Sequence, residues 1–263
     1  MTSTEEATRG PAGRSGSFRR FAGLVALLSL PVAIGNLLTI GIAAHFNLNV
    51  VSHPSLLLHA GTASARWWHA SMLLDVLGYY LMIVPLTLVL RSHFKRRSQG
   101  WTDLFVLCLL AYSFIGAIGG VILATVIPPM IQSYVTAPSA HRQILDIVGT
   151  GYSDAVYRGM WNLLEEFLAG IGWLGIGLMQ RREDRRLGTL TIVLGVACLV
   201  DSLGTALNVD GIATPGLTTY LVLAPVWAAW QGIRLLTSPN ATAWDGHRRR
   251  GPAMIRSSSR DSG

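Results

Sequence analysis

Long runs of hydrophobic residues alternate along the chain with short polar stretches that carry most of the charges. A run of about 20 apolar residues crosses the hydrocarbon core of a bilayer as an α-helix, because no water there can bond to open backbone groups. Six segments reach this length: residues 21–44, 67–90, 102–127, 156–179, 187–208 and 215–236. The pattern predicts an all-α bundle of six transmembrane helices, with Pro128 and Pro129 ending the third.

The composition supports a membrane domain with little soluble structure. Of the 263 residues, 51% are hydrophobic and 13% are charged, against about 25% charged in an ordinary soluble domain. Residues 1–20 and 237–263 are rich in Ser, Gly, Arg and Pro, and we expect both to be disordered tails. Residues 21–236 then form one helical domain, whose outer loop 128–155 is expected to contain a short interfacial helix at about 139–148.

The formal net charge of +7 raises the question of nucleic acid, but the positions of the basic residues exclude it as a partner. All 21 Lys and Arg residues except Arg66, Arg142 and Arg158 lie before the first span, in the second and fourth loops, at the end of the last span, or in the tail that follows it. Such an asymmetry is the positive-inside pattern, which predicts that the N and C termini are both cytoplasmic.

Several features bear on the cellular compartment. The first apolar run exceeds the 7 to 15 residues of a signal-peptide core, so we interpret it as a retained membrane anchor. Cys108 and Cys198 fall inside predicted spans and form no disulfide framework or thiol motif. Lys95 is the only lysine, a bias toward Arg that is typical of GC-rich bacterial genomes. These features predict a multi-pass protein of a bacterial plasma membrane.

Four carboxyl groups fall inside the predicted spans: Asp75, Glu165, Glu166 and Asp201. A carboxylate at the bilayer centre costs a few kcal/mol, so a compensating interaction is required. At 1.5 Å per residue, all four lie roughly 10 to 14 Å below the outer ends of their helices. The sequence therefore predicts a single intramembrane polar layer.

Two amides and an arginine extend this layer. Asn36 on the first span falls at the same depth, and Asn162 lies one turn above the glutamates. On the fourth span Arg158, Asn162 and the glutamates share one helical face, which makes Arg158 a candidate to neutralise the carboxylates. Because adjacent residues of an α-helix point about 100° apart, we expect only one glutamate, Glu166, to face the layer.

Other residues of the spans receive structural interpretations. Tyr157, Trp161 and Tyr220 lie near predicted span ends, where aromatic rings favour the headgroup region, and we assign them to that boundary. Pro31, Pro85 and Pro225 lie inside spans, where each frees a backbone carbonyl that then needs another partner.

Three functions remain open for the polar layer. It can line an outward-facing pocket that binds or conducts a small solute, a cation or a proton. It can serve only as hydrogen-bonding between helices in a structural or regulatory protein that binds another membrane protein. It can also belong to an intramembrane lipid-modifying enzyme with Ser71, Ser113 or Ser202 as nucleophile.

The enzymatic interpretation finds little support in the sequence. The histidines near the outer surface form no pair at i, i+4, and no phosphate loop, serine elbow or CxxC motif is present. We therefore predict no catalytic residues, no metal and no cofactor, and expect the bilayer and a small solute or ion, or another membrane protein, as partners.

Two segments resemble a known family. Residues 186–203 contain the pattern Leu-Gly … Gly … Leu-Val-Asp-Ser, and residues 68–97 place an aspartate in an apolar helix that ends in basic residues. Both resemble a bacterial family of uncharacterised multi-pass membrane proteins, catalogued as a domain of unknown function. The resemblance implies six spans but no activity and no site residues, so the polar layer rests on the physical argument.

Overall fold

The computed structural model describes residues 11–47, 50 and 54–237, and this part of the chain is helical without strands. The elements are α1 (Pro11–Ala43), the short η2 (Pro54–His59), α3 (Thr62–Asp75), η3 (Val76–Leu81), α4 (Ile83–Phe94), α5 (Gln99–Thr136), α6 (Ser139–Asp154), η4 (Ala155–Glu165), α7 (Glu166–Gln180), α8 (Arg185–Ala206) and α9 (Asp210–Thr237). The elements η3 and η4 are π-helical, with wider turns than an α-helix. The prediction of an all-helical bundle is confirmed for these residues.

Five of the helical segments are long and apolar enough to cross a membrane: Gly16–Ala43, Thr62–Phe94, Gln99–Thr136, Arg185–Ala206 and Asp210–Thr237. They correspond to all the predicted spans except residues 156–179. That remaining stretch forms η4 and α7, and it carries Glu165 and Glu166 at the junction between them. The two buried glutamates make it the most polar of the predicted spans.

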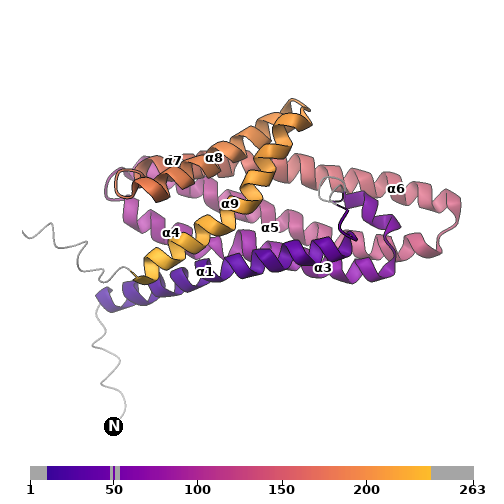
Figure 1. The fold of residues 1–263 in the computed structure, drawn as a ribbon, viewed down its shortest axis with the longest axis horizontal. Coiled ribbons are helices and arrows are strands. Elements are labelled where there is room, and N and C mark those ends of the chain that lie inside the picture. Colours follow the sequence, from indigo (N-terminus) through magenta and orange to yellow (C-terminus); the bar gives the residue numbers. More distant parts are fainter. Residues whose placement is uncertain (1–10, 48–49, 51–53, 238–263) are drawn as a thin grey trace, which may run out of the picture.

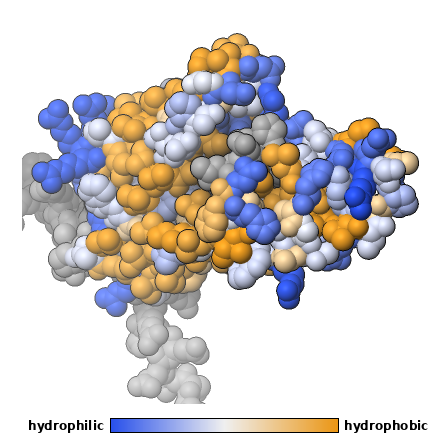
Figure 2. All heavy atoms as spheres, turned by 45° about the vertical axis from the view of Figure 1, so that its right-hand side comes forward, coloured by the Kyte–Doolittle hydropathy of each residue, from blue (hydrophilic) through white to orange (hydrophobic). Residues whose placement is uncertain are grey.

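Most of the helices run roughly along the long axis of the molecule, whereas α9 crosses them obliquely from the α8–α9 turn at the top (Figure 1). The start of α1, the α4–α5 and α7–α8 turns and the end of α9 lie at one end, which we call the basic end because it contains Arg91, Lys95 and Arg181. The η2 segment and α6 lie at the opposite end, which we call the cap end. Between them, hydrophobic side chains cover much of the surface, whereas hydrophilic side chains gather toward the two ends (Figure 2).

The structure corrects the predicted end of the third span, because α5 continues through Pro128 and Pro129 to Thr136. Its 38 residues span about 57 Å, well beyond the ~30 Å of a hydrocarbon core. A proline removes the N–H that would bond to the carbonyl four residues earlier. For Pro128 that carbonyl belongs to Ala124, and it accepts a hydrogen bond from Nδ1 of His69 at 2.9 Å.

The cap end is therefore more ordered than the sequence indicates. The predicted interfacial helix at 139–148 is present as the longer α6, Ser139–Asp154. Leu57 and Leu58 of η2 are fully buried there against a cluster that includes Met130 and Ile131 of α5. At the other end, α1 begins at Pro11, inside the segment predicted as a disordered tail. The remaining predicted tail residues, 1–10 and 238–263, lie outside the described residues.

Inside the bundle, a side chain also bonds to a backbone carbonyl that a second proline leaves without its helical donor. Pro225 of α9 leaves the carbonyl of Leu221 without its helical N–H donor. The hydroxyl of Tyr79, a buried residue of η3, donates to that carbonyl at 3.0 Å. The hydrogen bond therefore replaces a backbone bond and ties η3 to α9.

This replacement predicts a coupled effect of two substitutions. Tyr79→Phe should lower the free energy of unfolding by about 1–3 kcal/mol, because the Leu221 carbonyl loses its donor in a buried position. In a Pro225→Ala background, the restored N–H should make the same substitution nearly neutral. Thermal unfolding of the four proteins in detergent measures the coupling, with Tyr152→Phe on the exposed face of α6 as the matched control. Equal losses in the two backgrounds would contradict this account.

Candidate functional site

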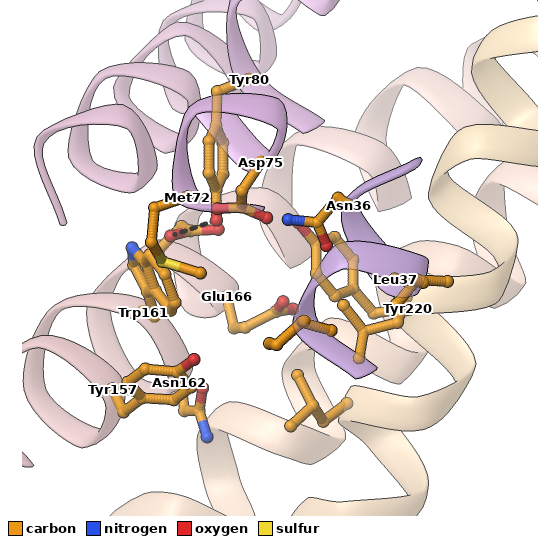
Figure 3. Close-up of a pocket in the computed structure, with 14 residues that line it drawn as sticks. Asn36, Leu37, Met72, Asp75, Tyr80, Tyr157, Trp161, Asn162, Glu166 and Tyr220 are labelled. Atoms are coloured by element: carbon orange, nitrogen blue, oxygen red, sulfur yellow. Dashed lines mark hydrogen bonds between the residues drawn. The ribbon is translucent and has the colours of Figure 1, made fainter. Parts of the chain in front are cut away.

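A cavity of about 90 Å³ lies inside the bundle, between α1, α3, η3, η4, α7 and α9. Its walls are formed by Asn36, Leu37, Ile40, Met72, Asp75, Tyr80, Tyr157, Trp161, Asn162, Glu165, Glu166, Leu217, Tyr220 and Leu221. Figure 3 shows Asp75, Tyr80 and Asn36 on one side, and Glu166 extending into the centre. The volume has room for several water molecules or for one small solute.

Three of the four predicted carboxyl groups converge on this cavity. Asp75, Glu165 and Glu166 all line it and are 9%, 1% and 2% exposed. Each lies at a boundary between α- and π-helix: Asp75 ends α3, Glu165 ends η4 and Glu166 begins α7. The expectation that only Glu166 faces the layer is wrong, because Glu165 is buried and lines the same cavity.

The hydrogen bonds of the site fix some of its polar groups and leave others open. The Tyr80 hydroxyl donates to Oε2 of Glu165 at 3.3 Å, and the Asn36 amide donates to the Ser71 carbonyl at 2.7 Å. In contrast, Oδ2 of Asp75 and Oε2 of Glu166 are buried without a hydrogen-bond partner among the described residues. The Asp75 oxygen lies toward Gly120 of α5, 3.7 Å from a Cβ added there, so these acceptors are unused but buried within the walls of the site.

No Lys or Arg is among the described residues that line the cavity beside the carboxyl groups. The ion pairs found within the described part of the chain all involve other carboxylates. The proposed partner Arg158 is exposed and donates to the side chain of Asn208, so it does not neutralise the layer. The π-helical turns of η4 separate its direction from that of the glutamates. A carboxylate buried without a cation is costly, so these groups need either a proton or a bound cation.

Asp201 occupies a separate position. It is fully buried on α8, but it does not line the cavity, and neither of its oxygens has a hydrogen-bond partner in the described structure. The backbone of α9 passes directly against Asp201. A Cβ added to Gly216 would lie only 2.6 Å from the Asp201 nitrogen. Asp201 thus belongs to the tight α8–α9 contact next to the site.

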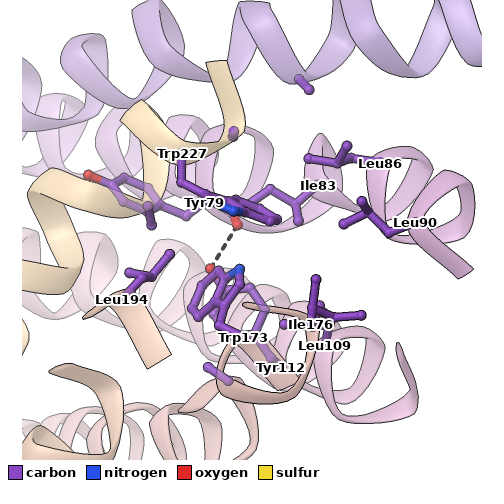
Figure 4. Close-up of a cluster of buried hydrophobic side chains, with 14 of the residues drawn as sticks. Tyr79, Ile83, Leu86, Leu90, Leu109, Tyr112, Trp173, Ile176, Leu194 and Trp227 are labelled. Carbon is purple, nitrogen blue, oxygen red and sulfur yellow. Dashed lines mark hydrogen bonds between the residues drawn. The ribbon is translucent and has the colours of Figure 1, made fainter. Parts of the chain in front are cut away.

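The bundle between the cavity and the basic end is closely packed and contains a network of buried polar side chains around Gln180. There Thr191 donates to Gln180 at 2.9 Å, and Gln231 and Trp227 complete the same network at 3.1 and 2.8 Å. The rings of Tyr112, Trp173 and Trp227 fill the space beside it (Figure 4). The side chains of the Gln180 network thus satisfy one another, whereas Nε1 of Trp173 beside them, like the open oxygens of Asp75 and Glu166, has no partner among the described residues.

Small residues on α5 make room for the aromatic walls. A Cβ added to Gly116 would lie 2.0 Å from the Tyr80 ring, and one added to Gly119 would lie 2.3 Å from Nε1 of Trp161. Trp161 also donates to the Gly116 carbonyl at 3.1 Å. The glycines thus place two rings against α5, and these rings hold η3 and η4 around the cavity.

The aromatic residues are the part of the site that sequence reasoning missed. Tyr157, Trp161 and Tyr220 were expected at the membrane boundary, but all three line the cavity. A signal is present in the sequence, since Tyr157, Trp161 and Glu165 follow one another at intervals of four residues. Because Tyr157 and Trp161 follow the spacing of a buried glutamate, they are expected to point into the bundle, and their distance from the span end is the weaker guide.

The chemistry of the site does not include the enzymatic elements considered from the sequence. The hydroxyls of Ser71, Ser113 and Ser202 each donate to a backbone carbonyl, at 3.1, 3.1 and 2.9 Å. Across the described residues, no group of three or more His, Cys, Asp or Glu side chains is arranged to hold a metal ion. What the geometry offers is a small enclosed space with carboxyl and aromatic walls.

Comparisons with models of protein families, with curated proteins and with solved structures found no match to this chain.

The glycine contacts predict where added volume is damaging. Gly116→Ala should lower the free energy of unfolding by about 1–3 kcal/mol, because the Tyr80 ring must leave its position against α5 and its hydrogen bond to Glu165 is disturbed. Gly159→Ala, at a site with no atom within 4 Å, should be neutral or slightly stabilising. Thermal unfolding in detergent distinguishes the two, and equal effects would show that Tyr80 is not held as described.

Proposed function

We propose that this chain is an integral protein of a bacterial plasma membrane, with six transmembrane helices and both termini in the cytoplasm. Five apolar helices of sufficient length support this, together with η4 and α7, which continue one another from Ala155 to Gln180. The basic residues of the α4–α5 and α7–α8 turns lie at the same end as the start of α1 and the end of α9. The resemblance to an uncharacterised family of bacterial multi-pass proteins is part of the same proposal.

This orientation predicts opposite labelling of the two ends of the bundle. A membrane-impermeant maleimide applied to intact cells should label Ala140→Cys on α6 and should leave Lys95→Cys unlabelled until the cells are opened. The native thiols give little background, because Cys108 and Cys198 are both buried. Labelling of Lys95→Cys in intact cells would reverse the proposed orientation.

For the molecular function, we propose that the cavity binds a small cation or a proton and passes it across part of the membrane. The observation that carries this proposal is the convergence of Asp75, Glu165 and Glu166 on one cavity without a positive side chain. A packing role alone favours a private partner for each buried group, as in the Gln180 network. The open oxygens of Asp75 and Glu166 favour a ligand instead.

The proposal predicts that neutral substitutions in the cavity abolish flux. In vesicles containing the purified full-length protein, Asp75→Asn and Glu166→Gln should reduce the flux of protons or monovalent cations to that of protein-free vesicles. Asp146→Asn, an equivalent change on α6 outside the cavity, should retain it. Ion-sensitive dyes inside the vesicles measure the flux. Unchanged flux in both cavity variants would overturn the proposal and favour a structural or regulatory role.

A further inference from the structure

The walls of the cavity specify the ligand further, and this step rests on the proposed cation-binding function. Beside the three carboxyl groups stand four aromatic residues, Tyr80, Tyr157, Trp161 and Tyr220. They come from three different elements, so the rings lie on more than one side of the space (Figure 3). Aromatic rings combined with carboxylates are the recognition chemistry of organic ammonium ions.

The rings form a connected surface rather than separate contacts. The centroids of Tyr157 and Trp161 are 4.7 Å apart, and those of Tyr80 and Trp161 are 6.5 Å apart. The hydrogen bond from Trp161 to Gly116 and the one from Tyr80 to Glu165 hold two of these rings in place. A ligand that enters the cavity therefore meets preoriented π-faces, which lowers the cost of ordering them on binding.

The same walls are poorly suited to a divalent metal ion. Ca²⁺ takes six to eight oxygen ligands and Mg²⁺ takes six, at fixed short distances. The carboxyl groups of the described residues form no cluster that could hold a metal ion. A methylated ammonium spreads its charge over its methyl groups and needs no such coordination, so dispersed carboxyl groups and ring faces are sufficient.

The size and the apolar wall define the rest of the ligand. The volume of about 90 Å³ is small beside the 300–1,000 Å³ typical of drug-sized ligands. The rest of the wall includes the aliphatic residues Leu37, Ile40, Leu217 and Leu221 of α1 and α9, together with Met72 and two asparagines, and Leu37 is 44% exposed. An ammonium headgroup fits among the rings, while an apolar substituent can extend along these side chains.

From these observations we propose that the cavity binds a methylated organic ammonium ion. The ring of Trp161 and the carboxylates of Asp75 and Glu166 contact the cationic headgroup, and the aliphatic wall contacts its apolar substituent. Asn36, whose amide is fixed on the Ser71 carbonyl, bounds the headgroup site beside Asp75.

Calorimetric titration of the full-length protein in lipid nanodiscs tests this proposal. Tetramethylammonium and choline should bind and release heat, whereas the uncharged isostere of choline, with carbon in place of nitrogen, should give no binding. Glu166→Gln and Trp161→Leu should weaken binding about tenfold or more, and Trp161→Phe should recover part of the loss, because a ring is present again. Asp146→Asn and Trp101→Leu, outside the cavity, should leave the affinity unchanged.

The possible results distinguish failure of the ammonium site from failure of the proposed cation-binding function. Equal affinity for choline and its uncharged isostere, or unchanged affinity in both Glu166→Gln and Trp161→Leu, would overturn the ammonium site. Absence of ammonium binding by a protein whose proton or monovalent-cation flux still depends on Asp75 would overturn it while leaving the proposed function intact. Loss of the affinity in Glu166→Gln with normal thermal unfolding would support it.

Discussion

The constraint on which this structure depends is that a polar group inside an apolar bundle has no water to bond with, so it must find a partner within the chain. Most of the buried groups meet this requirement through bonds between helices distant in sequence. His69 bonds to the Ala124 carbonyl that Pro128 leaves open, and Tyr79 does the same for Leu221. These bonds allow proline to remain inside helices that continue beyond it.

A few buried groups do not meet the requirement, and two of them, on Asp75 and Glu166, belong to residues that line the cavity. Asp75 and Glu166 keep open oxygens, although a fully bonded network surrounds Gln180 nearer the basic end. The packing of Trp161 and Tyr80 against glycines of α5 shows that the surrounding structure is tight, so the opening is not a result of loose packing. Both the proposed cation site and its proposed ligand class follow from this local difference.

Much of the fold could be predicted from the sequence because it depends on local patterns. The apolar runs identified the helices, and the depth of the carboxyl groups indicated one layer of Asp75, Glu165, Glu166 and Asp201, of which the first three line the cavity and Asp201 does not. The predictions from sequence were wrong where the structure depends on a partner distant in sequence or on an irregular helix. The continuation of α5 depends on His69, which lies 55 residues away from the carbonyl it contacts. The burial of both glutamates and the outward position of Arg158 depend on π-helical turns, which no hydrophobic period reveals.

Those turns have a consequence for movement as well as for position. The bond from the Met82 N–H to the Leu77 carbonyl, at 3.0 Å, spans five residues and shows the wide turn in η3. A wide turn contains one residue more than the α-helical turn it replaces, and it can migrate along a helix one residue at a time while both helix ends stay fixed. Each such step turns the residue it passes. With wide turns in both η3 and η4, a shift of either turn changes the facing of Tyr80 or Glu165 without any helix sliding along its axis.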